Sequence, residues 1–237
     1  MTTLELVPIS ILCPTYNRSK FLPLFTKNLQ LTNYPKDKLE LVIDDDGTEP
    51  FIVDMEQFKR DIHPIEVNYL RYPQRRTIGD KRNNLVKKSS NKIVVFMDDD
   101  DIYHPDYIPY SYTSLKVNKA GIVGSNQMIF IFPEDNWLIT GIQCEKKFQM
   151  HEATMMMTKK YFRAMQGFSR TSQGEGASII QLQDKNVFIT DIRFCMICVG
   201  HDGNTISKED FKNSTSMENP AVMDLPQVEI LKTILGI

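Results

Sequence analysis

The sequence has few cysteines, little net charge and no long apolar run. Its 237 residues include four cysteines, and the formal net charge is −2. Such a small charge gives no general attraction to nucleic acid or to an anionic membrane. No apolar run reaches the roughly 20 residues needed to span a bilayer, and the N-terminus lacks the basic and apolar regions of a signal peptide. We therefore expect a cytoplasmic protein with no nucleic-acid partner and no membrane-spanning segment.

Two of the cysteines, Cys195 and Cys198, form a C-x-x-C motif. The motif lies in the apolar run RFCMICV, and no second pair is present that could complete a zinc site. We interpret all four cysteines as free thiols of a reducing compartment.

Apolar runs that suit buried strands alternate with helix-like segments through the first half. Four such strand–helix units predict a mostly parallel central sheet flanked by helices. In sheets of this kind, ligands bind at the carboxyl ends of the strands. Most of the unusual polar residues lie at those ends, at positions 14–17, 44–46, 75–76 and 98–101.

The second half has a different pattern and predicts a smaller mixed subregion. A hairpin is expected around residues 133–136, and the segments VFITD and RFCMICV are expected to close the sheet. Helices are expected from His104 and over EGASIIQLQDK. The tail after residue 207 ends in VEILKTILGI, which we interpret as a helix for packing or for a homodimer. The chain contains no linker or repeat, so we expect one domain, 1–237.

The segment LELVIDDDGTEP has two interpretations. Asp44 to Thr48 spells D-x-D-G-T after a strand, which is typical of the nucleophile loop of haloacid-dehalogenase-like phosphatases. In the other interpretation these aspartates bind the base of a sugar nucleotide. The phosphatase pattern expects its nucleophile strand to open the domain, whereas a complete strand–helix unit comes first here.

A run of four aspartates, Asp98 to Asp101, follows the apolar strand KIVVF. Adjacent carboxylates repel one another and are costly to bury unless a cation neutralises them. A hard divalent ion shared with substrate phosphates is the natural partner. The alternative is a solvated acidic turn before the next helix.

Taken in order, the segments ISILCPTYNR, LELVIDDDG, RRTIGDKRNN, VVFMDDDDIYHPDYI and GEG resemble the nucleotide-sugar glycosyltransferases of the GT-A fold, family 2 in particular. In style they are also similar to glycosyltransferases of large DNA viruses, in which case the location would be the host cytoplasm. The resemblance implies a single Rossmann-like α/β domain. Its parts would be a donor-binding half (1–103), an acceptor-binding and catalytic half (104–207) and a C-terminal tail or helix (208–237).

The resemblance also implies roles for the donor-side residues. Either Asp45 or Asp46 would bind the pyrimidine N3–H, and either Arg75 or Arg76 would approach the base or the diphosphate. Asp98 or Asp99 would bind the ribose. The remaining donor-binding residues would be Pro14, Thr15, Tyr16, Asn17, Lys81 and Arg82.

For the metal and the acceptor, the resemblance implies a second set of residues. Mn²⁺ or Mg²⁺ would be bound by Asp100, with Asp98 and His201 as further ligands, and Glu175 would be the catalytic base. Gly176 stands where relatives often have a second acid. The acceptor-binding candidates are Trp137, His151 and Glu152.

The sequence thus predicts a metal-dependent, inverting glycosyltransferase. Its donor would be a nucleoside-diphosphate sugar, with a UDP-sugar preferred, and its acceptor a hydroxyl of a glycan or glycoprotein. Two alternatives stay open at this point: a phosphatase with Asp44 as nucleophile, and a non-catalytic carbohydrate-binding relative.

Overall fold

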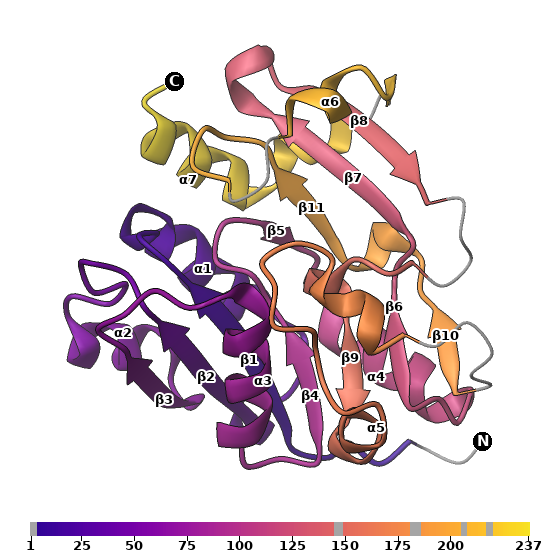
Figure 1. Ribbon diagram of the computed structural model, residues 1–237. Coiled ribbons are helices and arrows are strands. Elements are labelled where there is room, and N and C mark those ends of the chain that lie inside the picture. Colours follow the sequence, from indigo (N-terminus) through magenta and orange to yellow (C-terminus); the bar gives the residue numbers. More distant parts are fainter. Residues whose placement is uncertain (1–3, 145–148, 181–185, 205–207, 217–219) are drawn as a thin grey trace.

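The protein is described by a computed structural model that covers residues 4–144, 149–180, 186–204, 208–216 and 220–237. It is an α/β protein with a seven-stranded sheet in the order β10-β6-β9-β4-β1-β2-β3 and a five-stranded sheet in the order β12-β8-β7-β11-β5 (Figure 1). The strands are β1 (Ile9–Thr15), β2 (Leu39–Asp45), β3 (Glu66–Arg71), β4 (Ile93–Phe96), β5 (Ile102–Tyr103), β6 (Ile122–Gly124), β7 (Gln127–Phe132), β8 (Leu138–Gln143), β9 (Met156–Thr158), β10 (Val187–Ile189), β11 (Met196–Val199) and β12 (Thr215–Ser216). The α-helices are α1 (Leu22–Leu31), α2 (Met55–Ile62), α3 (Ile78–Lys88), α4 (Tyr107–Val117), α5 (Lys159–Ala164), α6 (Glu209–Lys212) and α7 (Pro226–Leu235).

The central sheet is mostly parallel, as the sequence predicts. Strand β1 pairs in parallel with both β2 and β4, and β2 pairs in parallel with β3. Only β9, which lies between β4 and β6, runs antiparallel to its neighbours. Because the four parallel strands end at one edge, the polar segments that follow them are brought together there.

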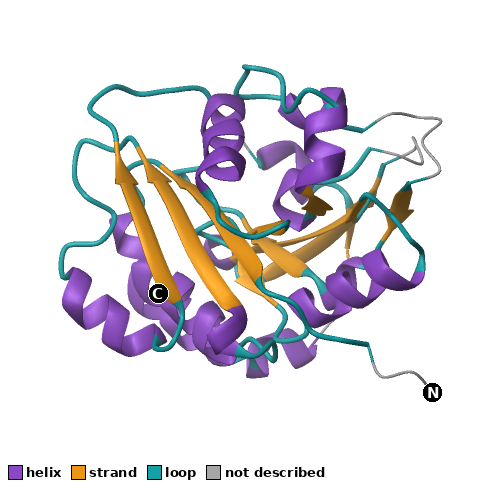
Figure 2. Ribbon diagram, turned by 90° about the horizontal axis from the view of Figure 1, so that it is seen from below, coloured by secondary structure: helices purple, strands orange, loops and turns teal. Residues whose placement is uncertain are grey.

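Both faces of the central sheet are covered by helices (Figure 2). Alternate side chains of β1 point to opposite faces. Ile9 and Ile11 belong to the core cluster that includes side chains of α1, α2 and α4. Leu12 belongs to a second cluster with side chains of α3 and α5. This two-sided burial explains why the parallel strands read as continuous apolar runs.

The second sheet forms the subregion beside the central sheet. Strands β7 and β8 are the predicted antiparallel hairpin, with Phe132 opposite Leu138. Strand β10 lies at the edge of the central sheet, as predicted, but the prediction for RFCMICV was wrong. That segment contains β11, which pairs with β7 and β5 in the second sheet. Strand β5 directly follows the four aspartates and provides an edge with which β11 can pair. Asp101 reinforces this pairing by accepting a hydrogen bond from Val199 N at 3.0 Å.

Two predicted helices are shorter than expected. Residues 102–103 pair with β11, so the following helix begins at Tyr107 rather than His104. The segment at Glu175 forms a 3-10 turn, Glu175–Ser178. Residues 181–185 of that prediction lie outside the described part of the chain.

The tail contains the predicted C-terminal helix. Val228 and Leu231 of α7 are buried, and the helix packs against α1. Its part in a homodimer stays a prediction. Among the described residues, no helix is long and apolar enough to cross a membrane.

Candidate active site

A cavity of about 160 Å³ opens at the carboxyl edge of the central sheet. The loop after β1, the segment before α3 and the four aspartates after β4 all contribute to it. Residues of the second half close its other side. The lining residues are Pro14, Tyr16, Arg18, Arg75, Arg76, Ile78, Lys81, Asp98, Asp99, Asp100, Asp101, His151, Ser172, Glu175, Cys198, Asn204 and Lys208.

Asp44 is fully buried behind this cavity and does not line it. Its Oδ1 forms an ion pair with Arg76, and its Oδ2 accepts a hydrogen bond from Asn84 at 2.7 Å. Burial raises the pKa of Asp44, although Asn84 and Arg76 oppose the shift. With both oxygens engaged, Asp44 cannot attack a phosphate ester as the phosphatase interpretation requires.

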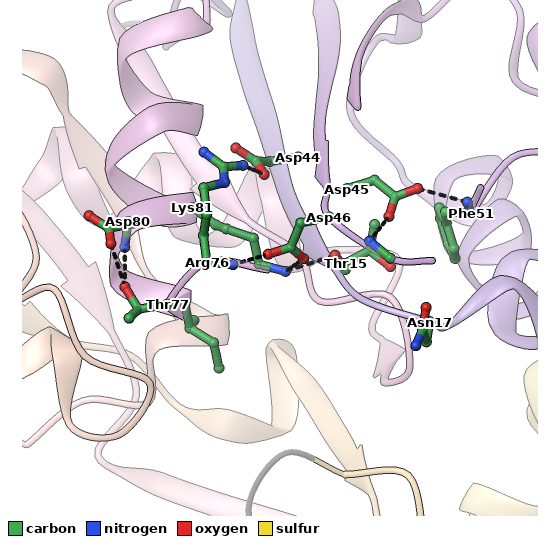
Figure 3. A network of polar contacts seen from close by, with 12 residues as sticks. Thr15, Asn17, Asp44, Asp45, Asp46, Phe51, Arg76, Thr77, Asp80 and Lys81 are labelled. Carbon is green, nitrogen blue, oxygen red and sulfur yellow. Dashed lines mark hydrogen bonds and ion pairs between the residues drawn. The ribbon is translucent and has the colours of Figure 1, made fainter. Parts of the chain in front are cut away.

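Asp45 holds the loop that follows β2 in place (Figure 3). Its carboxylate accepts hydrogen bonds from Gly47 N and Phe51 N, both at 2.8 Å, and pairs with Arg71 at 2.7 Å. Burial acts to raise the pKa of Asp45, but the hydrogen bonds from Tyr69 and the two amides, together with Arg71, outweigh it and lower that pKa. The protein itself therefore uses most of the hydrogen-bonding capacity of this side chain.

Asp46 joins β2 to the segment that carries the basic residues. Its Oδ1 lies 2.7 Å from Lys81 Nζ, and its Oδ2 accepts a hydrogen bond from Arg76 N at 2.6 Å (Figure 3). Lys81 also donates to Thr15 O at 2.7 Å. The three predicted donor-side segments are thus tied together by one buried lysine, which helps to position Arg76 beside the cavity.

Helix α3 begins at the cavity with a threonine cap. Thr77 Oγ1 accepts a hydrogen bond from Asp80 N at 3.1 Å. A Cβ at Gly79 would lie 1.8 Å from Ser169 O and 3.2 Å from Cβ of Glu175. Only glycine allows this close approach, which brings the Glu175 turn against the start of α3.

Tyr16 and Arg75 form one wall of the cavity. The guanidinium carbon of Arg75 lies 4.2 Å from the Tyr16 ring centroid, within cation–π range. The two side chains present a flat surface next to a cation, which suits a nucleotide base. Asn17, another predicted donor residue, does not line the cavity. Its Oδ1 accepts a hydrogen bond from Thr48 N at 2.8 Å, and it thereby joins the loops after β1 and β2.

The four aspartates have different surroundings. Asp101 bonds to Val199 N and is structural, whereas Asp98 pairs with Arg82 at 3.3 Å. Oδ1 of Asp98 and Oδ2 of Asp99 are buried without a hydrogen-bond partner among the described residues. Burial raises the pKa of Asp98 and, with the neighbouring Asp100 charge, raises that of Asp99 further. Carboxylate oxygens are the type of ligand that hard divalent cations prefer.

Asp100 contacts two groups from distant parts of the chain. Its Oδ2 lies 3.1 Å from Arg18 Nε and 3.1 Å from His201 Nε2. Burial acts to raise the pKa of Asp100, but His201 and Arg18 outweigh it and lower that pKa. Nδ1 of His201 accepts a hydrogen bond from Gly203 N at 3.1 Å. The structure therefore brings the predicted metal residues Asp100 and His201 together.

A divalent metal fits these side chains only if the substrate supplies some of its ligands. Among the residues that the structure describes, no three His, Cys, Asp or Glu side chains form a complete cage for a metal. The unpaired oxygens of Asp98 and Asp99, with Asp100 beside them, are hard donors of the kind that Mg²⁺ and Mn²⁺ prefer. Such ions commonly use one or two carboxylates and take their remaining ligands from substrate phosphates.

Glu175 lines the cavity next to the start of α3 and is 5% exposed. Its Oε1 accepts a hydrogen bond from Arg82 Nε at 3.1 Å, so Arg82 links Glu175 to Asp98. Burial acts to lower the pKa of Arg82, but Asp98, Glu175 and Glu152 outweigh it and raise that pKa. Arg82 therefore stays charged and acts as a link between carboxylates.

The three predicted acceptor residues lie in different places. His151 lines the cavity, and Glu152 is next to the Glu175 turn, where its Oε1 accepts a hydrogen bond from Gly176 N at 3.0 Å. Burial, together with Lys208 and Arg82, lowers the pKa of His151 to about 3. Trp137 does not line the cavity. It lies in the β7–β8 turn, and Lys232 of α7 lies 6.0 Å from its ring.

Besides Ile78 and Cys198, four cavity residues were absent from the sequence prediction: Arg18, Ser172, Asn204 and Lys208. Burial acts to lower the pKa of Lys208, but its electrostatic interaction with Cys198, Asp101 and Asp100 outweighs burial and raises that pKa. Arg18 directly follows the predicted P-T-Y-N segment, so its place could have been found. The other three come from loops without a regular pattern. The cysteines are free, as predicted.

Comparison with known proteins connects this site to one family. The sequence profile of glycosyl transferase family 2 matches residues 10–174, from the second residue of β1 to the residue before the Glu175 turn. A search of curated proteins gave no significant match.

Solved structures with the same fold include a mannosyltransferase and a protein bound to UDP-GlcNAc. The mannosyltransferase PcManGT from Pyrobaculum calidifontis, in complex with GDP-Man and Mn²⁺, has 16% sequence identity and a TM-score of 0.62, and the match covers 87% of this chain. S. aureus TarS 1-349, in complex with UDP-GlcNAc, has 16% identity and a TM-score of 0.65, with 97% of this chain covered. The chain spans 59% of the mannosyltransferase and 72% of the TarS fragment. At these identities the likeness shows the GT-A fold.

Proposed function

The chain belongs to glycosyl transferase family 2, and we propose that it transfers a sugar from a nucleoside-diphosphate donor to a hydroxyl of a glycan or glycoprotein acceptor. The preferred donor is a UDP-sugar, and the reaction inverts the anomeric carbon. Residues 1–103 would supply the donor side, and residues 104–207 would supply the acceptor side.

One observation carries this proposal: the cavity has cations on one side and unpaired carboxylate oxygens on the other. Arg75, Arg76 and Lys81 line it together with Asp98 and Asp99, whose free oxygens are buried. A nucleoside diphosphate with a divalent cation matches both sides, because the diphosphate is anionic and the cation joins it to the carboxylates.

The donor would lie with its base against Tyr16 and Arg75 and with its ribose at Asp98 or Asp99. Asp45 and Asp46 are both hydrogen-bonded within the protein. Contacts between this loop and the base would therefore come from its backbone and from Lys81. Asp100 and Asp98 would supply one or two carboxylate ligands to Mn²⁺ or Mg²⁺, with phosphate oxygens as its other ligands, and His201 would orient Asp100 through its Nε2. Such a metal, when bound, supplies positive charge to the leaving diphosphate. The mannosyltransferase neighbour was solved with GDP-Man and Mn²⁺, which supports this assignment.

Glu175 would be the base of the transfer step. The acceptor oxygen forms a bond to the anomeric carbon as the bond from that carbon to the diphosphate oxygen breaks, and the acceptor proton passes to the Glu175 carboxylate. Its position supports this role, because it lines the cavity beside the start of α3 and is fixed by Arg82.

His151 would contact the acceptor or the transferred sugar. Its Nδ1 accepts a hydrogen bond from Ala153 N at 3.2 Å, so Nε2 carries the proton of the neutral ring. Nε2 is buried without a partner among the described residues. A sugar hydroxyl would satisfy this donor, whereas Trp137 is placed for an acceptor only if that acceptor extends to the β7–β8 turn.

The proposal is tested by incubating the protein with UDP-GlcNAc, UDP-glucose and GDP-mannose, with and without Mn²⁺, and measuring release of the nucleoside diphosphate. Water serves as the acceptor in this assay, so no glycan needs to be known in advance. We expect metal-dependent release from at least one donor. A protein that releases none, and binds none of the corresponding nucleotides, would overturn the proposal.

A further inference from the structure

Glu152 takes up the space in which residue 176 would carry a side chain. A Cβ at Gly176 would lie 2.5 Å from Oε1 and 3.0 Å from Cδ of Glu152. The same Oε1 accepts a hydrogen bond from Gly176 N at 3.0 Å. The carboxylate of Glu152 therefore occupies the space that the carboxylate of an acidic residue at position 176 would occupy.

The hydrogen bond to Gly176 does not require a charged group. A glutamine at 152 has the same length and an amide oxygen that would accept from Gly176 N equally well. A carboxylate adds a cost at this position, because the group is largely removed from water and lies close to the charge of Glu175. These two causes, burial first, raise the pKa of Glu152. The negative charge of Glu152 is therefore not needed to stabilise the fold at this position.

The charge of Glu152 acts on Arg82, which also binds the proposed base. Arg82 donates to Glu175 at 3.1 Å and to Asp98 at 3.3 Å, and Glu152 is the third carboxylate that stabilises its guanidinium. Nη1 of Arg82 is buried without a hydrogen-bond partner among the described residues. When Glu175 accepts a proton and loses its own charge, Asp98 and the nearby Glu152 are the carboxylates that still balance Arg82.

We infer that Glu152 is a positioning residue for the base. It holds the Glu175 turn through Gly176 N, and its carboxylate balances the Arg82 charge so that Glu175 can accept the acceptor proton. This inference rests on the proposed function. A nearby negative charge strengthens a carboxylate base, whereas an unbalanced guanidinium weakens it.

The deciding variant is Glu152→Gln, which keeps the hydrogen bond and removes the charge. Turnover is measured as UDP release from UDP-GlcNAc, or as GDP release from GDP-mannose if that donor is the one hydrolysed. We expect kcat to fall about 10-fold or more, because an unbalanced guanidinium beside Glu175 makes it a weaker base. KM and the calorimetric affinity for UDP or GDP with Mn²⁺ should stay within about 2-fold, because the donor contacts are intact. Glu56→Gln, on the exposed face of α2, is the matched control.

A position swap supplies the second test. Gly176→Asp alone should reduce kcat because its Cβ meets Glu152, and Glu152→Ala alone should reduce it because the carboxylate is lost. The double variant Glu152→Ala/Gly176→Asp returns a carboxylate to the same space and should regain part of the lost kcat. If the double variant does not fold, as judged by circular dichroism, Glu152→Gln alone decides.

The outcomes distinguish the positioning role of Glu152 from the proposed function. Wild-type turnover with an unchanged kcat in Glu152→Gln would overturn the positioning role and leave the proposed function standing. A folded double variant no faster than Glu152→Ala would overturn the equivalence of the two positions. If the wild type hydrolyses neither donor and binds neither nucleotide, the proposed function fails and this inference falls with it.

Discussion

Nζ of Lys81 lies 2.7 Å from Oδ1 of Asp46, and this buried pair joins helix α3 to the end of strand β2. Lys81 is only 4% exposed, and it also donates to the carbonyl of Thr15. The pair therefore fixes the edge of the central sheet at which the cavity opens.

Removing the lysine should destabilise the whole domain. Lys81→Met leaves Asp46 as a buried charge without its partner, which costs about 3–5 kcal/mol in the free energy of unfolding. Urea denaturation followed by circular dichroism measures this change. The control Lys59→Met removes an exposed pair with Glu56 and should cost less than about 1 kcal/mol. Equal losses in the two variants would show that the buried pair has no special role.

Tyr16 should contribute to nucleotide affinity without affecting the metal. Tyr16→Ala removes the ring that packs against Arg75, and we expect a loss of about 1–2 kcal/mol in UDP binding from the lost aromatic and cation–π contacts. Calorimetry with and without Mn²⁺ measures both quantities. An unchanged affinity would place the base elsewhere in the cavity.

Asp100 should be required for the metal effect. Asp100→Ala removes the carboxylate that contacts Arg18 and His201, and we expect UDP affinity to become independent of Mn²⁺. Asp37→Ala, at an exposed position before β2, is the control and should keep the metal effect. A metal effect of normal size in Asp100→Ala would move the metal to other residues.

Glu175 should be required for turnover but not for donor binding. Glu175→Gln keeps the size of the side chain and removes its basicity, so nucleotide release should fall by about 10²–10⁴-fold, the usual contribution of a general base. Its UDP affinity should match the wild type. Normal turnover in this variant would exclude Glu175 as the base.

The partly buried His151, whose Nε2 is fully buried, should make the protein less stable in acid. Its pKa is about 3 in the folded protein, against an ordinary value of 6.5, so the unfolded chain binds the proton more readily below pH 6.5. The stability that depends on the neutral ring is therefore present above pH 6.5 and is lost progressively as the pH falls toward 3. Linkage gives a loss of about 1.5 kcal/mol between pH 6.5 and pH 5.

Urea denaturation at several pH values tests this loss by comparing two variants. His151→Gln should remove the histidine contribution to the slope of unfolding free energy against pH. His104→Gln, at a partly exposed position, should keep it. An identical slope in the wild type and in His151→Gln would contradict the burial of a neutral ring.

The sequence was sufficient to predict the parallel sheet and the carboxyl edge at which the site lies. Strands that are buried on both faces form continuous apolar runs between helix-like segments. Such runs are visible in short stretches of sequence, such as residues 9–13 and 93–96. The partners of the aspartates could not be read in the same way. Asp44, Asp45 and Asp46 have similar neighbours in sequence, yet Arg76, Arg71 and Lys81 bind one each, because successive side chains leave the strand in different directions.

The acceptor side was harder to predict because its contacts join distant loops. The expected helix at Glu175 is a 3-10 turn held by Arg82, Ser169 and Glu152, which lie on three other segments. Strand β11 joined the second sheet because β5, only two residues long, provides an edge directly after Asp101. Neither contact has a periodic pattern in the sequence.

The most direct test of the central claim is a calorimetric titration of the wild type with UDP, GDP, TDP and CMP, with and without Mn²⁺. The account predicts that at least one nucleoside diphosphate, UDP foremost, binds more tightly when the metal is present. CMP, which has a single phosphate, should show a smaller metal effect. If no nucleotide binds more tightly with Mn²⁺, the assignment of this cavity as a metal-dependent donor site is wrong.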